Sequence, residues 1–149
     1  MYKRQILREA DQVVDRQARL FGGRLYPLQL QPQGPLRHWT RHTASQHHGQ
    51  DIKLVWEPAR FGWAAALARA YLFSGDERYP AAFWAFTEEF SAANPPSIGP
   101  NWASGQEVSL RLMALAFSAG VMLDSPHTTS ARLELLKGCL LYTSDAADE

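Results

Sequence analysis

The sequence predicts an all-α protein built from successive antiparallel helix pairs. Apolar residues recur at spacings of three and four along most of the chain, which is the period of a helix face. Clusters of Gly, Pro, Ser and Asp interrupt this pattern at short joints, and no stretch alternates apolar and polar residues as a strand does. Corresponding points of neighbouring helices lie about 25 residues apart, a spacing that fits helical repeats and an α/α toroid equally well.

Composition indicates one folded domain without a strong overall charge. The chain has 149 residues, of which 46% are hydrophobic and 20% are charged. Its 15 basic and 15 acidic residues cancel, so no global field attracts nucleic acid or an anionic membrane surface. No apolar run reaches the roughly 18 residues that a membrane span requires. We therefore expect no nucleic-acid or membrane partner, and any anionic ligand would have to be held by local groups.

The first and last residues indicate whether the sequence carries a signal peptide and where its native part ends. The first residues lead into an amphipathic helix instead of a signal peptide. Localisation therefore stays open: periplasmic or secreted if the true N-terminus carries a signal, and otherwise cytoplasmic. Residues 139–149 resemble the in-frame translation of a transposon-end sequencing adapter, and the alternative is an ordinary acidic helix tail. We expect residues 1–138 to be a native, partial domain and the protein to continue past Gly138.

The first helix is expected to run from the start of the chain to Gly22-Gly23, which would end it. Its apolar face is formed by Ile6, Ala10, Val13, Val14, Leu20 and Phe21. Residues 24–50 show neither period and read as a long irregular segment. His38 and His42 have i, i+4 spacing, but the defined third ligand that a zinc site needs is missing. We expect a His-rich loop there, and no metal or cofactor.

Four more helices follow, paired by short joints. The second begins at Pro58, which suits a first helical position because its missing N–H would have no partner there. Ser74-Gly75-Asp76 joins it to the third, with Gly as the left-handed C-terminal residue and Asp as the N-cap. Asn94-Pro95-Pro96 ends the third helix. The fourth, 105–123, is apolar on nearly every side, which predicts burial all round, and a fifth begins at 129–137.

Two helix openings carry the candidate site. In each, a Trp precedes an acid and an Arg follows that acid by three or four positions: Trp56, Glu57 and Arg60, then Trp102, Glu107 and Arg111. Ser104 and Glu107 have the spacing of a capping box, and Glu107 and Arg111 that of an i, i+4 ion pair. Indole faces suit sugar rings and guanidinium groups suit carboxylate or sulfate, and Trp63 offers a third such face. The alternative is that the acid–arginine couples are buried pairs that fix the helix starts and that the Trp residues are core.

Several short stretches between residues 55 and 111 occur in an order that points to a known family. They are Val-Trp-Glu-Pro-Ala-Arg at 55–60, Leu-Ala-Arg-Ala-Tyr at 67–71, Ser-Gly-Asp-Glu-Arg-Tyr at 74–79, Ala-Asn-Pro-Pro at 93–96, Asn-Trp-Ala-Ser at 101–104 and Glu-Val-Ser-Leu-Arg at 107–111. Together they resemble the N-terminal domain of the heparinase II/III family. Ala59 departs from the family pattern, in which this position is commonly polar.

The resemblance implies an incomplete α/α toroid, followed in whole members by an antiparallel β-sheet domain. It also implies a polysaccharide lyase that cleaves uronate-containing chains by β-elimination. That reaction needs a donor that neutralises the uronate carboxylate, and a Tyr or His that takes the neighbouring proton. The family's groups for these steps lie on later helices or in the sheet domain, so no catalytic residue is expected here, and Asn101 is not the family's catalytic Asn.

We therefore interpret the described openings as cleft wall for an acidic polysaccharide. The expected substrate-binding residues are Trp56, Glu57, Arg60, Asn101, Trp102, Glu107 and Arg111. One alternative is another α/α-toroid carbohydrate enzyme, a glycoside hydrolase, which would need Glu57 and Glu107 as paired inward carboxylates. A second alternative is a helical-repeat interaction protein without a polar cleft.

Overall fold

The structure, a computed structural model, describes residues 2–32, 35–41 and 51–145, with side chains described as far as Cys139. The described elements are α1 (Tyr2–Val14), β1 (Gln17–Arg19), β2 (Leu25–Pro27), η1 (Trp39–Arg41), α2 (Lys53–Ala59), α3 (Gly62–Ser74), α4 (Arg78–Ala93), η3 (Pro100–Trp102), α5 (Gly105–Val121) and α6 (Ser130–Asp145). The chain is mostly helical, as predicted. Among these helices none is both long enough and apolar enough to cross a membrane.

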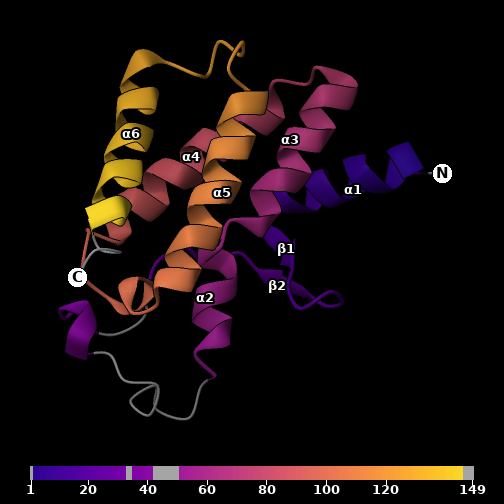
Figure 1. Cartoon of the computed structure of the whole chain (residues 1–149). Coiled ribbons are helices and arrows are strands. Elements are labelled where there is room, and N and C mark those ends of the chain that lie inside the picture. Colours follow the sequence, from indigo (N-terminus) through magenta and orange to yellow (C-terminus); the bar gives the residue numbers. More distant parts are fainter. Residues whose placement is uncertain (1, 33–34, 42–50, 146–149) are drawn as a thin grey trace.

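The helices form two stacked pairs. Figure 1 shows α3 and α5 side by side and running in the same direction, with α4 and α6 behind and to their left. α4 packs against α3, α6 packs against α5, and α4 also contacts α6. α1 contacts α3 and α4 and lies on the side of α3 that faces away from α6. The predicted antiparallel helix pairs are therefore confirmed, and like members of successive pairs are neighbours.

The first helix ends earlier than predicted, and a hairpin follows it. α1 stops at Val14, and Arg16 adopts a left-handed conformation with φ 58°. The chain then forms an antiparallel pair of strands in which Ala18 faces Tyr26. The turn between the strands uses Gly22 at φ 76°, so the Gly pair that we interpreted as a helix end is a hairpin turn. The predictions of a helix to Phe21 and of a chain without strands were both wrong.

The buried positions explain why this hairpin was hidden in the sequence. Ala18 and Leu20 point inward and are 2% and 6% exposed, so they join the same core as the α1 face. A stretch of three residues per strand is too short to reveal alternation. Inward residues that fit a helical stripe by spacing can therefore lie on a strand instead.

The second helix does not begin at Pro58. Pro58 lies inside α2, and the break falls at Phe61, whose φ of 60° is left-handed. The Phe61 side chain is fully buried, with its ring centroid 4.7 Å from that of Trp63 and 5.1 Å from that of Phe90. Burying a Phe gains about 1.5–3 kcal/mol, which offsets the about 1–2 kcal/mol that a left-handed conformation costs. A long-range contact therefore sets this break.

The joints that follow agree better with the sequence. Gly75 has φ 67° and its N–H bonds the carbonyl of Tyr71 at 2.8 Å, as predicted for a helix C-terminus. Asp76 Oδ1 accepts the N–H of Arg78 at 3.0 Å, at the start of α4. The prediction of a capping box at the start of α5 was wrong, because the Ser104 side chain makes no cap hydrogen bond.

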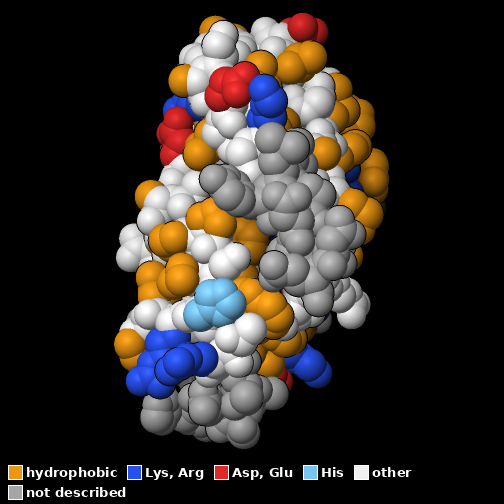
Figure 2. All heavy atoms as spheres, turned by 60° about the vertical axis from the view of Figure 1, so that its left-hand side comes forward, with side chains coloured by type: hydrophobic (Ala, Val, Ile, Leu, Met, Phe, Trp, Pro, Cys, Tyr) orange, Lys and Arg blue, Asp and Glu red, His pale blue; other side chains and the backbone are white. Residues whose placement is uncertain are grey.

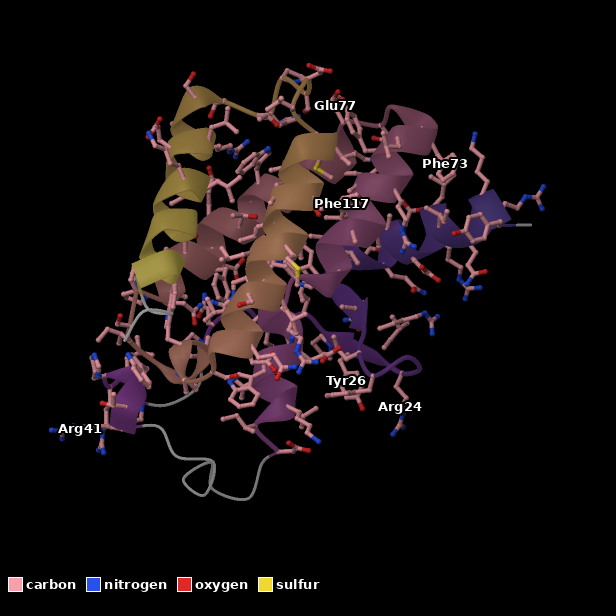
Figure 3. The ribbon with its side chains drawn as sticks, in the orientation of Figure 1. Arg24, Tyr26, Arg41, Phe73, Glu77 and Phe117 are labelled. Carbon is pink, nitrogen blue, oxygen red and sulfur yellow. The ribbon has the colours of Figure 1, made fainter. Side chains whose placement is uncertain are left out.

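The helix expected to be buried all round has one open face. Met113 and Phe117 on α5 are 62% and 52% exposed, and Leu72 on α3 is 66% exposed. Figure 3 shows Phe117 on the side of α5 that faces the viewer. α5 packs against α3 on one flank and α6 on the other, and no described element covers the remaining face. The prediction of complete burial was therefore wrong.

Candidate functional site

The two helix openings identified in the sequence meet at one junction. Trp56 Nε1 on α2 donates to the carbonyl of Pro100 on η3 at 2.9 Å. Arg111 Nε on α5 donates to the carbonyl of Ala59 at 2.7 Å. These bonds join segments that are 44 and 52 residues apart in sequence. The junction is therefore a tertiary feature that α2, η3 and the first turns of α5 build together.

Arg60 lies at the centre of the junction, between two carboxylates. Its Nε and Nη2 donate to Glu107 at 2.5 and 2.7 Å, and its Nη1 donates to Glu57 at 2.5 Å. These bonds raise the pKa of Arg60, and the hydrogen bond to Glu107 is the largest cause. The Arg60 and Glu57 side chains keep 31% and 24% of their surface, whereas that of Glu107 keeps 6%. The pair Glu57–Arg60 occurs as expected within one opening, but Glu107 reaches across to the other.

Arg111 is buried and has a different set of partners from the one predicted. It is 3% exposed, and its Nη2 donates to the carbonyl of Asn101 at 2.8 Å, in addition to its Nε bond to Ala59. The expected ion pair with Glu107 does not form, because that carboxylate is engaged by Arg60. Burial lowers the pKa of Arg111 to about 10, so the group is still cationic near neutral pH.

Two donors at this junction have no hydrogen-bond partner within the described part of the chain. They are Arg111 Nη1 and Trp102 Nε1, and both atoms are buried. The Arg111 guanidinium carbon lies 5.3 Å from the Trp102 ring centroid and 4.8 Å from that of Phe90. Buried donors without a partner are uncommon because each loses its hydration. The junction therefore has two N–H donors that can still accept a hydrogen-bond partner, next to the rings of Trp102 and Phe90.

Asn101 holds the junction to the rest of the core. Its Nδ2 donates to Asn94 Oδ1 at 2.8 Å, and Asn94 in turn donates to the carbonyls of Leu30 and Phe90, each at 2.9 Å. Both amides are buried, at 3% and 2% exposure. Sequence reasoning missed Asn94, which we interpreted only as part of a helix stop. An Asn directly before two Pro residues was the available signal, because its amide can satisfy the last carbonyls of the helix.

The tryptophans divide into two kinds. Trp56 and Trp102 are half-buried at the junction. Trp63 is 6% exposed, its Nε1 donates to the carbonyl of Pro58 at 2.9 Å, and its ring packs on Phe61 and Phe86. Trp63 is therefore a core residue and offers no face to a ligand.

Two cavities border the junction. One, of about 210 Å³, lies between the hairpin and α2 and is lined in part by Tyr26, Leu30 and Ala59. The other, of about 320 Å³, lies between α4, α5 and α6 and is lined in part by Trp102 and Arg111. Figure 2 shows the face from the side of α6 and η1, where mainly hydrophobic side chains lie between a basic cluster near the lower end and mixed charges near the upper end.

The metal site considered at His38 and His42 lies partly outside the described residues. His38 Nδ1 lies 2.9 Å from Thr40 Oγ1, and His42, its predicted i, i+4 partner, falls outside the described residues. Within the described ranges, no group of three or more His, Cys, Asp or Glu side chains could hold a metal ion.

Comparison with known proteins adds no assignment. No family model, no curated protein and no solved structure matches this chain. The function must therefore be argued from its residues and geometry.

Proposed function

We propose that this chain is the N-terminal helical part of a polysaccharide lyase that cleaves uronate-containing polysaccharide by β-elimination, and that its junction belongs to the substrate-binding wall. The observation that carries the proposal is the meeting of the two openings. The stretches 55–60 and 101–111, which resemble one family by sequence, are joined by Trp56–Pro100, Arg60–Glu107 and Arg111–Ala59 bonds. The order of the helices supports the same reading, because successive pairs stacked with like members adjacent are what an α/α toroid requires.

Exposure separates the roles within the proposed wall. Trp56, Glu57, Arg60 and Trp102 retain accessible surface and are the residues that we propose to touch sugar. Asn101, Glu107 and Arg111 are buried, so their contribution is to position the exposed four. The proton-handling groups of β-elimination are proposed to come from the rest of the protein, in the missing helices and β-sheet domain of the same chain.

The glycoside hydrolase alternative fits the geometry less well. Its mechanism needs one protonated acid and one carboxylate with room for a sugar between them. Glu57 and Glu107 instead bond different nitrogens of the Arg60 guanidinium, so this side chain occupies the space that a sugar would need.

A protein-interaction role is the second candidate, and a specific observation favours it. Leu72, Met113 and Phe117 expose large apolar side chains on neighbouring helices. Exposed apolar surface of this kind is typical of faces that contact other helices or another protein. This role would use the α3–α5 face and would leave the junction without a ligand.

Binding to acidic polymers tests the proposal on this chain. Affinity electrophoresis in gels containing alginate, polygalacturonate or heparan sulfate should retard the protein, and a gel containing neutral dextran should not. Trp56→Ala should reduce the retardation, because it removes an accessible face at the junction, whereas Leu72→Ala should leave it unchanged. Equal mobility in all gels, or a loss of retardation only with Leu72→Ala, would contradict the proposal.

The proposed lyase activity is tested on a longer protein that carries the proposed further helices and β-sheet domain. That protein should release products with an unsaturated uronate end, which are followed by their ultraviolet absorbance. Failure to release such products from any uronate polymer of the panel would count against a lyase, even if the helical part binds the polymers.

A further inference from the structure

We infer that the 320 Å³ cavity between α4, α5 and α6 is a binding site for a small carboxylate with an apolar body, held by Arg111 Nη1 and Trp102 Nε1. This site shares Trp102 and Arg111 with the sugar-binding wall proposed above, but it uses their buried N–H donors, whereas the wall uses the accessible surface of Trp102. A polymer chain would contact the accessible side chains of the junction, whereas this ligand would enter the molecule. Either proposal can fail without the other.

Arg111 forms no ion pair among the described residues, although it interacts electrostatically with Cys139 and Glu107. Arg60 takes both nearby carboxylates, those of Glu57 and Glu107. Arg111 has only two backbone carbonyls as hydrogen-bond acceptors among the described residues, although it is 3% exposed. A buried cation is stabilised strongly by a hydrogen-bonded counter-charge. Its Nη1 makes no hydrogen bond to the described residues and can donate to a carboxylate.

A second donor lies next to the first. Trp102 Nε1 is buried without a described partner, and its ring lies 5.3 Å from the Arg111 guanidinium carbon. Both residues line the same cavity. A carboxylate has two oxygens, so one can accept from each of these donors. Two spare donors that border one space point to one shared acceptor group.

The remaining lining selects an apolar body over a sugar. Apolar side chains outnumber the uncharged polar ones: Phe61, Phe90, Pro96, Leu112, Leu115 and Leu135 line the cavity, against Thr87, Ser91 and Asn94. The Thr87 hydroxyl donates to the Phe83 carbonyl and the Asn94 amide to Leu30 and Phe90, so these donors are already used. The volume lies at the lower end of the roughly 300–1,000 Å³ range of ligand pockets. A single ring therefore fits better than a chain.

The other titratable groups of the cavity do not oppose an anion strongly. Glu134 also lines it, but its side chain is 72% exposed and lies 3.4 Å from Lys137 Nζ. Cys139 lies 3.6 Å from the Ser91 hydroxyl and also interacts electrostatically with Arg111, so a carboxylate bound to Arg111 would share that cation with this thiol. Of the lining residues, Cys139 alone belongs to the adapter-like stretch, so the donors and the apolar walls come from the part of the chain expected to be native.

Titration with 4-methylbenzoate tests the inference. The probe should bind in calorimetry and should shift the indole N–H signal of Trp102 in nitrogen-edited NMR spectra, assigned by its loss in Trp102→Phe. The neutral isostere 4-methylbenzamide should bind at least about tenfold more weakly, because it brings no charge to Arg111. Glucuronate should also bind more weakly, because its ring is polar.

Trp102→Phe separates a ligand role from a structural one. The Nε1 donor has no described partner, so its removal should leave the thermal midpoint equal or slightly higher, while affinity for 4-methylbenzoate falls about tenfold. Arg111→Met should abolish binding, and circular dichroism must first show that this variant is folded. Equal affinity for acid and amide, tighter binding of glucuronate, or unchanged affinity in Trp102→Phe would overturn the inference.

Discussion

Arg60 and Glu107 lie 47 residues apart in sequence and form an ion pair with two hydrogen bonds, of 2.5 and 2.7 Å. The pair joins the end of α2 to the first turn of α5, and Glu57 bonds the third side of the same guanidinium. Because Arg60 takes Glu107, the buried Arg111 must find its acceptors in the backbone. The Arg60–Glu107 pair thus links the two helix openings. It also leaves Arg111 Nη1 beside the cavity without a described acceptor.

The amide network at the end of α4 predicts a large stability effect. Asn94→Ala would remove the side-chain bonds to the carbonyls of Leu30 and Phe90 and to the Asn101 amide, while the Phe90 carbonyl would keep its bond from the backbone N–H of residue 94. We expect the free energy of unfolding to fall by about 2–4 kcal/mol in urea denaturation. Ser74→Ala is the control: its hydroxyl also bonds a helix carbonyl, but the residue is exposed, so the change should stay within about 0.5 kcal/mol.

Two glycines without steric neighbours should respond in opposite directions. A Cβ at Gly75 or at Gly120 would meet nothing within 4 Å, so only backbone conformation matters. Gly75 has φ 67°, and Gly75→Ala should destabilise the protein by about 1 kcal/mol. Gly120 lies within α5, and Gly120→Ala should stabilise it by about 0.5 kcal/mol. Thermal unfolding of both variants checks this, and equal shifts of the midpoint would contradict the conformation assigned to Gly75.

Tyr79 should make the protein sensitive to alkali. Burial, together with its hydrogen bond to Asp11 Oδ1 of 3.0 Å, raises the pKa of Tyr79 from 10.0 to about 12. Between these values the folded state keeps the proton while the unfolded state loses it. Stability is therefore complete below pH 10 and falls as pH rises toward 12.

A variant isolates this contribution from other groups that titrate at high pH. Urea denaturation at about pH 9 and about pH 11.5 should show a loss of about 2 kcal/mol in the wild type that is absent in Tyr79→Phe. The variant should be about 1 kcal/mol less stable at the lower pH, because it lacks the hydrogen bond. An equal loss in both proteins would show that Tyr79 does not cause it.

The sequence predicted the features that depend on local signals. Gly75 and Asp76 mark a joint, and Asn94 ends α4. The two openings with Trp56 and Trp102 were assigned to one cleft wall by the family resemblance and not by a local signal. Their meeting at one junction is confirmed, whereas their use by a sugar chain is still a proposal. Local signals sufficed because helix ends are set by caps and breakers within a few residues.

The features that the sequence did not predict depend on distant contacts. Phe61 keeps its left-handed conformation because its ring is buried against that of Phe90. Glu107 forms its ion pair with Arg60 and not with Arg111, which lies one turn away on the same helix. The strands after α1 follow from inward burial of Ala18 and Leu20. Helical spacing at these positions was compatible with more than one local structure, and tertiary packing decided between them.

A double-mutant cycle at Arg60 and Glu107 tests the junction most directly. Urea denaturation of Arg60→Met, Glu107→Gln and the double variant should give a coupling free energy of about 1.5–3 kcal/mol. The same cycle at the Arg132–Glu88 pair is the control, because the Glu88 side chain is 45% exposed and that of Glu107 only 6%, and it should give about 0–1 kcal/mol. Arg60 and Glu107 effects that add to within about 0.5 kcal/mol would contradict a junction between the two openings.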